Sequence, residues 1–210
     1  MQGAYVNPRQ VDAYLLIERY GDFLLTGAVR PGPDLPVVPR EGFRPAVYRD
    51  RKHGFVIPLI TASISREKLF DVFLSLLEPL GDVVDVILET SHKRRDGKHR
   101  DLRRRGIDNP ILASYCCEFE DLLVNDGCTG IAVMSASEPM EVQFDEHKVL
   151  TIYAANLRPF RRILKSFEIP RDDSIKLISE GAHLHSTEPH HYPEFKSLCY
   201  RLGIGKLSRV

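Results

Sequence analysis

The sequence lacks the features that would place it in a membrane or among disulfide-stabilised proteins. It contains no tryptophan and only 4 cysteines among 210 residues. No apolar run approaches the roughly 20 residues that cross a bilayer. The first residues include Arg9 and Asp12 and have no apolar core of the kind that a secretory signal needs. We therefore expect a protein with no membrane association and a cytoplasmic location.

Net charge and cysteine spacing exclude two further classes. The 29 Lys and Arg residues balance the 29 Asp and Glu residues, so the chain has no general excess of positive charge for nucleic acid. Cys116 and Cys117 are adjacent, whereas Cys128 and Cys199 stand apart. This pattern suits neither a disulfide framework nor a C-x-x-C metal or redox motif. We expect four reduced thiols that behave as small apolar residues.

Residues 1–50 are predicted to form an N-terminal arm. Asn7 followed by Pro8 is typical of a helix start, and apolar residues at helical spacing continue to Gly21. Residues 28–50 contain five prolines, which neither continue a helix nor fit a central strand. This part is predicted to be an extended connection.

Residues 51–210 are predicted to form a single α/β domain, in which helices cover a mixed sheet. An elaborated ferredoxin-like α+β arrangement is the alternative. The hydrophobic pattern predicts strands at 55–64, 83–88, 131–134, 140–144, 149–154 and 175–178, and helices after Ser65, from Asn109 to Leu123, at 157–167 and at 193–202.

An internal duplication is predicted within this domain, with units at 55–127 and 140–203. When residues 59–92 are set against 150–183 without a gap, 7 of the 34 pairs are identical, against about two expected for unrelated sequences. Both stretches are predicted to be strand–helix–strand. Each unit would then be β-α-β-α, with the two strands of a crossover running parallel.

Four of the 8 histidines lie within nine residues, as His183, His185, His190 and His191. In an extended segment, His183 and His185 point the same way and can hold one metal ion. Glu188, His190 or His191 would supply a third ligand and leave an open position, as hydrolytic zinc requires. The alternative is a polar loop whose imidazoles form local hydrogen bonds and respond to pH.

Two pairs of residues, Glu89 with His92 and Glu180 with His183, resemble a general base with its orienting partner. Residues three apart on a strand face opposite sides. Such a couple would therefore form between the units, or beyond the strand ends.

A basic segment spans residues 93–105 and contains Lys93, Arg94, Arg95, Arg103, Arg104 and Arg105. Guanidinium groups bind phosphate oxygens in pairs of hydrogen bonds, so this segment could contact a phosphate or nucleic acid. No aromatic residue interrupts it, which gives base stacking no support. The alternative is a solvated loop, or one paired to acidic residues of the predicted hairpins.

No G-x-S-x-G elbow or phosphate loop is present, and whether the protein is an enzyme stays open. The leading hypothesis is a non-catalytic intracellular binding or regulatory protein with a protein partner, or a homo-oligomer. The first alternative is a zinc-type metal-dependent enzyme that uses the histidine cluster. The second is phosphate or nucleic-acid binding by the basic segment.

Overall fold

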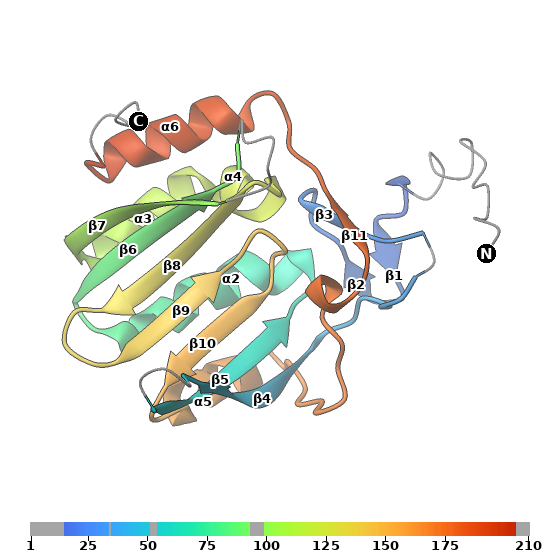
Figure 1. The fold of residues 1–210 in the computed structure, drawn as a ribbon, viewed down its shortest axis with the longest axis horizontal. Helices are drawn as coiled ribbons and strands as arrows, with labels where there is room; N and C mark the ends of the chain where they lie inside the picture. The colour runs from blue at the N-terminus through green and yellow to red at the C-terminus, as the bar shows by residue number, and fades with distance from the viewer. Residues whose placement is uncertain (1–14, 34, 51–53, 93–98, 205–210) are drawn as a thin grey trace.

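A computed structural model describes residues 15–33, 35–50, 54–92 and 99–204. The N-terminal part holds three short strands, and the body alternates strands with helices (Figure 1). In chain order the elements are β1 (Arg19–Tyr20), β2 (Phe23–Leu24), β3 (Val29–Pro31), β4 (Gly42–Arg49), β5 (Val56–Ser63), α2 (Arg66–Leu77), the 3-10 helix η1 (Glu78–Leu80), β6 (Val83–Thr90), β7 (Arg100–Asp108), α3 (Asn109–Glu118), α4 (Glu120–Asn125), β8 (Thr129–Ser135), β9 (Met140–Phe144), β10 (Leu150–Ala154), α5 (Arg158–Ser166), the 3-10 helix η2 (Ile178–Glu180), β11 (His183–His185) and α6 (His191–Arg201).

The body is built on a seven-stranded sheet in the order β4-β5-β10-β9-β8-β6-β7. Every neighbouring pair in this sheet is antiparallel. The crossover through α2 connects β5 and β6, and these two strands do run in the same direction. They are not neighbours, because β10, β9 and β8 lie between them with alternating directions. The combination of helices with one large sheet is confirmed, but the predicted mixed sheet is wrong, because every neighbouring pair in the main sheet is antiparallel.

Both edges of the sheet come from segments that the sequence pattern placed in connections. β4 lies within the Pro-rich stretch, and Pro45 is tolerated because an edge strand needs fewer hydrogen-bond donors. β7 begins within the basic segment and buries Leu102 and Ile107, while Arg103 and Arg105 stay exposed. The sheet therefore extends across the domain boundary that was predicted at residue 50.

The strand predicted at 175–178 is absent, because this stretch is irregular and leads into η2. The second predicted unit thus has a counterpart to β5 and α2 in β10 and α5, but none to β6. The duplication itself remains a prediction from the sequence. The N-terminal helix predicted from Asn7 lies mostly outside the described residues.

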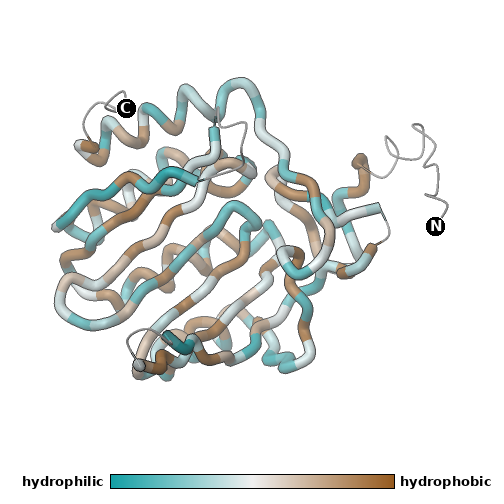
Figure 2. Tube along the Cα trace, in the orientation of Figure 1, coloured by the Kyte–Doolittle hydropathy of each residue, from teal (hydrophilic) through white to brown (hydrophobic). Residues whose placement is uncertain are grey.

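The main core lies between the helices and one face of the sheet. Along β6, Val84, Val86 and Leu88 are fully buried, while the residues between them are partly open. Figure 2 shows the same alternation of hydropathy along the sheet strands, as expected when one face packs and the other meets solvent. None of the described helices combines the length and apolar character that crossing a bilayer needs.

The N-terminal strands pack on one end of the body through a second, smaller core. Phe23, Leu25 and Val29 are buried there against Val149, Leu177 and Ile178. β3 pairs with β11 in a separate two-stranded sheet. The arm is therefore part of the fold, and it lies at the end of the sheet where the histidines gather.

Candidate metal centre

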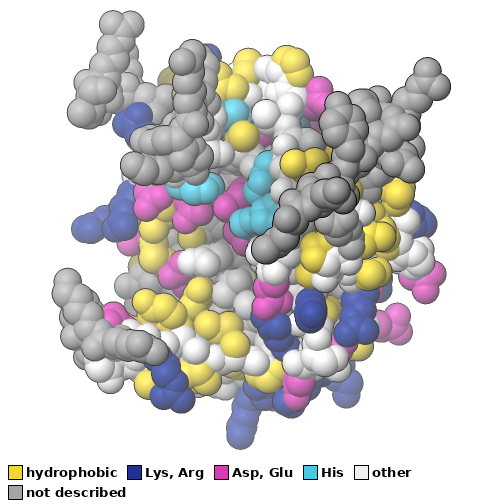
Figure 3. Space-filling view, turned by 45° about the vertical axis from the view of Figure 1, so that its right-hand side comes forward, with side chains coloured by type: hydrophobic (Ala, Val, Ile, Leu, Met, Phe, Trp, Pro, Cys, Tyr) yellow, Lys and Arg dark blue, Asp and Glu magenta, His cyan; other side chains and the backbone are white. Residues whose placement is uncertain are grey.

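Histidines from distant parts of the chain meet at one end of the sheet. His92 follows β6, His147 lies in the turn between β9 and β10, and His183 and His185 lie on β11. Figure 3 shows histidine side chains grouped on this face of the molecule, with acidic side chains beside them.

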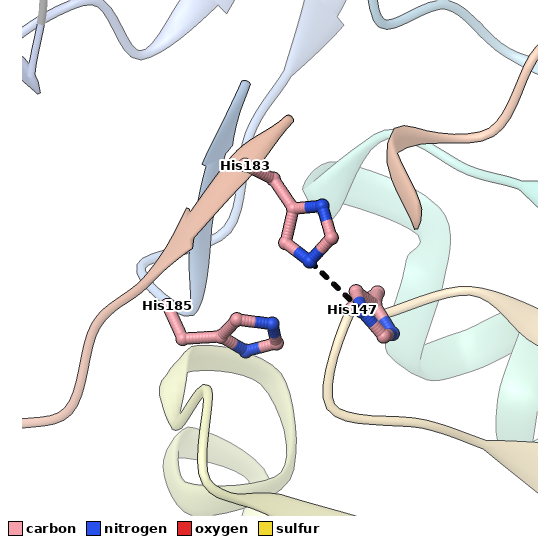
Figure 4. Close-up of side chains that lie close together, drawn as sticks. All are labelled: His147, His183 and His185. Atoms are coloured by element: carbon pink, nitrogen blue, oxygen red, sulfur yellow. Dashed lines mark hydrogen bonds between the residues drawn. The ribbon is translucent and has the colours of Figure 1, made fainter. Parts of the chain in front are cut away.

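The imidazoles of His147, His183 and His185 converge on one point (Figure 4). Their ring centroids are 4.7 Å apart for His147 and His183, 4.8 Å for His147 and His185, and 5.0 Å for His183 and His185. One ring nitrogen from each lies within 4.8 Å of those of the other two. Three nitrogen ligands are the number that a catalytic zinc site takes from the protein.

Hydrogen bonds fix which nitrogen of each ring carries the proton. The Nδ1 atom of His183 lies 2.7 Å from the carbonyl oxygen of Gly181, and that of His185 lies 2.8 Å from the carbonyl oxygen of Gly127. A carbonyl oxygen only accepts, so Nδ1 donates and the neutral ring keeps a lone pair on Nε2. His147 places Nδ1 3.3 Å from the Asp145 carboxylate in the same manner.

The Nε2 atoms of His147 and His183 are 3.1 Å apart. If both rings are neutral, their Nε2 lone pairs face each other over this distance and repel. A proton or a metal ion between the two nitrogens would remove this repulsion. Two nitrogens on one tetrahedral zinc, each bonded at about 2.0–2.1 Å, lie about 3.3 Å apart. The His147–His183 pair therefore already has nearly the spacing of two zinc ligands, and a nitrogen of His185 lies within 4.8 Å of both.

The electrostatic environment differs among the three rings. Burial lowers the pKa of His147, but the hydrogen bond to Asp145 and the charges of Asp145 and Glu146 outweigh it and raise the pKa above the ordinary value. Burial lowers the pKa of His185. The His147 side chain is 18% exposed, His183 is half-buried and His185 is exposed. Solvent therefore reaches the centre, which leaves room for a water or a substrate on a bound metal.

A tight turn positions His147. The Asp145 carboxylate accepts hydrogen bonds from the backbone N–H groups of His147 and Val149, at 3.0 and 2.9 Å. Lys148 adopts a left-handed backbone conformation, and its buried ammonium group donates to the carbonyl oxygen of Thr129 at 2.8 Å. Burial lowers the pKa of Lys148 to about 8. The Asp145 hydrogen bonds close the turn, and the Lys148 hydrogen bond holds it against the start of β8.

Gly127 positions His185. Its carbonyl accepts the His185 Nδ1–H, and its own N–H donates to the carbonyl oxygen of Ser186 at 2.7 Å. A Cβ atom at Gly127 would come within 2.3 Å of the carbonyl oxygen of Ala28 and 2.8 Å of that of Ser186. Only glycine allows this approach of three backbone segments.

We expect Gly127→Ala to weaken zinc binding about 10- to 100-fold, because the shifted carbonyl would no longer orient His185. Isothermal titration calorimetry with zinc measures the change. Gly106→Ala is the control, since Gly106 lies outside the centre and has open space around its Cβ position, although it differs from Gly127 in having a positive φ (60°). Equal zinc affinity of Gly127→Ala and the wild type would contradict this role.

The carboxylate of Asp126 is fully buried just before Gly127. It accepts hydrogen bonds from the Thr129 hydroxyl at 2.5 Å and the Cys128 N–H at 3.2 Å, and lies 3.2 Å from Nε2 of His92. Burial raises its pKa, but hydrogen bonds from His92, Thr129 and Thr187 outweigh burial and hold the pKa at about 2. The carboxylate is thus ionised and fixes the turn that carries Gly127.

The strand β11, which carries His183 and His185, pairs with the N-terminal arm and not with the main sheet. In the ladder between β11 and β3, His183 pairs with Pro31 and His185 with Val29. Beyond this ladder, the Ser186 N–H donates to the carbonyl oxygen of Ala28 at 2.8 Å. One of the three histidines therefore comes from the body, and two come from a strand that the arm holds in place.

The structure divides the predicted zinc ligands into two groups. His183 and His185 lie together, and His147 joins them. His190 and His191 instead direct Nε2 toward one carboxylate oxygen of Asp121, at 3.1 and 3.4 Å.

The backbone N–H of Glu188 donates to Nδ1 of His191 at 3.0 Å. In the neutral ring the proton of His191 therefore lies on Nε2, which then donates and has no lone pair for a metal. Sequence reasoning missed His147. The available signal was its place after two acidic residues, in a tight turn between two buried strands.

The Glu–His couples predicted from the sequence do not form among the described residues. His92 lies against Asp126, and Glu180 forms an ion pair with Arg44 at 2.8 Å. Glu89 lies near His99 and Glu146. The structure thus gives each member of the couples a different partner.

Of the predicted phosphate-binding residues, Lys93, Arg94 and Arg95 lie outside the described residues. Arg103 and Arg105 are exposed on β7, whereas Arg104 is half-buried.

The four cysteines are free, as expected. Cys116 and Cys199 are buried, but Cys117 is exposed and Cys128 is half-buried. Burial raises the pKa of Cys116 to about 12 and that of Cys199 to about 11. These two thiols are poor nucleophiles, because only the thiolate attacks.

Comparisons with protein-family models, with curated proteins and with solved structures found no match to this chain. What the molecule does must therefore be argued from the geometry of its own residues.

Proposed function

We propose that the protein is a zinc-dependent enzyme of the hydrolytic type, with His147, His183 and His185 as the metal ligands. The observation that carries the proposal is the set of three converging Nε2 atoms, each on a ring whose Nδ1 faces an oxygen acceptor. Metal-binding histidines generally have such a partner on the second nitrogen.

The surroundings of the centre favour catalysis over a purely structural metal. Structural zinc sites are closed by four protein ligands, whereas catalytic sites keep one position open. Here three imidazoles converge and the His185 side chain is exposed. Zinc held in this way lowers the pKa of a bound water to about 7, which supplies a nucleophile at neutral pH.

Acidic residues next to the centre give the chain its own means of handling a proton. Glu146 has a carboxylate oxygen 3.7 Å from Nδ1 of His147, and its side chain is 16% exposed. Its negative charge helps to raise the pKa of His147, which makes this ring the most basic neighbour of the open position.

Three other interpretations remain predictions. They are a non-catalytic binding protein, a protein partner or homo-oligomer, and phosphate or nucleic-acid contact through the basic segment 93–105. A cytoplasmic location is also proposed, supported by four unpaired cysteines.

Zinc binding tests the first half of the proposal. Protein stripped with a chelator and dialysed should bind zinc, and cobalt in its place should give the visible absorption of a tetrahedral site. His147→Ala, His183→Ala and His185→Ala should each lower the affinity at least 100-fold, because each removes a ligand. His190→Ala is the matched control, as an exposed histidine outside the centre. Absence of zinc binding, or equal losses in His190→Ala, would refute the assignment.

Hydrolysis of p-nitrophenyl acetate tests the second half. The rate should depend on zinc, rise with pH around 7, fall to the background rate in His183→Ala and stay unchanged in His190→Ala. A protein that binds zinc through these residues without accelerating hydrolysis would have a structural metal, and the enzymatic half would be withdrawn.

A further inference from the structure

A second group of ligand-type side chains lies beside the histidine centre. Glu89, His99 and Glu146 each offer one oxygen or nitrogen atom, and the three atoms lie within 4.8 Å of one another. Nε2 of His99 is 3.3 Å from a carboxylate oxygen of Glu146. That spacing matches two ligands of one cation with bonds of about 2.1 Å.

The sheet provides the space for this group. Glu89 lies on the open face at the end of β6, directly across from Gly130 on β8. A Cβ atom at Gly130 would come within 3.2 Å of a Glu89 carboxylate oxygen. The absence of a side chain at Gly130 lets the carboxylate lie flat over the sheet, half-buried and directed toward the β9–β10 turn that carries Glu146.

The charges at this end of the sheet favour a cation. Glu89 pairs across the strands with Asp101, and like charges in that position repel each other. Burial, followed by the charges of Glu146, Asp101 and Asp145, raises the pKa of Glu89, and His99 is the nearby group that opposes them. Among the described residues, no lysine or arginine forms an ion pair with Glu89, Asp101 or Glu146.

We propose that Glu89, His99 and Glu146 form a second divalent-cation site beside the histidine centre. Two carboxylates and one imidazole are a harder ligand set than three imidazoles, and suit Mn²⁺ better than the first centre does. The two sites meet at residues 145–147, where Glu146 lies 3.7 Å from the Nδ1 atom of His147. This inference goes beyond the zinc proposal and does not depend on it.

Titration of the zinc-loaded protein with MnCl₂ tests the second site. Zinc outcompetes Mn²⁺ for the imidazole centre. The electron paramagnetic resonance signal of free Mn²⁺ falls when the ion binds, so a loss of this signal measures binding at the second site. We expect one Mn²⁺ per chain, with affinity at least tenfold lower in Glu89→Gln and in His99→Ala. Glu141→Gln is the matched control, since Glu141 bonds to Gln143 on the same sheet and lies outside the group.

The outcomes separate the two proposals. No Mn²⁺ binding, or binding that Glu89→Gln leaves unchanged, overturns the second site, as does an equal loss in Glu141→Gln. Retention of Mn²⁺ binding in His183→Ala, which should lose zinc, supports two distinct sites. A protein that binds Mn²⁺ through Glu89 but never binds zinc would refute the proposed function and leave this inference standing.

Discussion

The double substitution Phe23→Ala and Leu25→Ala is expected to weaken zinc binding at least tenfold, although neither residue is one of the proposed ligands. Both side chains are buried in the small core that attaches the arm to the body. Removing large apolar groups from a core costs about 2–5 kcal/mol each. Once the arm detaches, β11 loses its partner strand, and only a fraction of molecules keeps His183 and His185 in place. The apparent affinity falls by that fraction.

Calorimetry with zinc measures the loss, and hydrogen exchange at Gly32, whose N–H donates to the carbonyl oxygen of Ala182, measures arm docking. By reciprocity, zinc should slow this exchange in the wild type by the same factor by which docking improves zinc binding. Leu16→Ala is the control, because Leu16 belongs to the same arm but is 79% exposed. An arm that exchanges freely in the double variant while zinc affinity stays unchanged would show that the strand holds its position without the arm.

Asp126→Asn is expected to lower the free energy of unfolding by about 2–4 kcal/mol at pH 7, because an ionised, fully hydrogen-bonded buried group is replaced by a neutral amide. The pKa of the carboxyl is about 2 in the folded protein, against an ordinary value of 3.8. A depressed pKa stabilises the folded state above pH 4. That contribution, about 2 kcal/mol, is lost as the pH falls from about 4 through 2.

Urea denaturation at pH 7, 4 and 2.5 tests this expectation. The difference between wild type and Asp126→Asn should be largest at pH 7 and shrink at pH 2.5. Asp173→Asn serves as the control, since the Asp173 side chain is 64% exposed in an ion pair with Arg171, and such pairs contribute little. A difference that stays constant with pH would mean that the Asp126 carboxylate does not contribute through its charge.

The sequence predicts local elements of this fold better than their arrangement. Five of the seven strands in the main sheet lie close to where hydrophobic periodicity predicts them, namely β5, β6, β8, β9 and β10, and so do the helices α2, α5 and α6. β4 and β7 were missed because edge strands tolerate proline and carry exposed charge. Sheet order depends on contacts between distant residues, which periodicity does not encode.

The candidate site shows the same contrast between residues that a local pattern reveals and residues that only the fold brings together. His183 and His185 could be recognised because a local H-x-H pattern in an extended segment sets their direction. His147 could not, since only the folded sheet brings its turn beside β11. The tautomers that distinguish His183 from His191 depend on the backbone groups each ring meets in the folded chain.

The pairing of β3 with β11 joins the two ends of the chain, and this has a consequence for the order of events during synthesis. β3 is synthesised well before β11, which follows only after almost the whole body has been made. Contacts between such distant segments form late, because the intervening chain must first be ordered. We therefore expect the metal centre to be the last region to become competent, so that a chain interrupted before residue 183 could build much of its sheet and still hold no zinc.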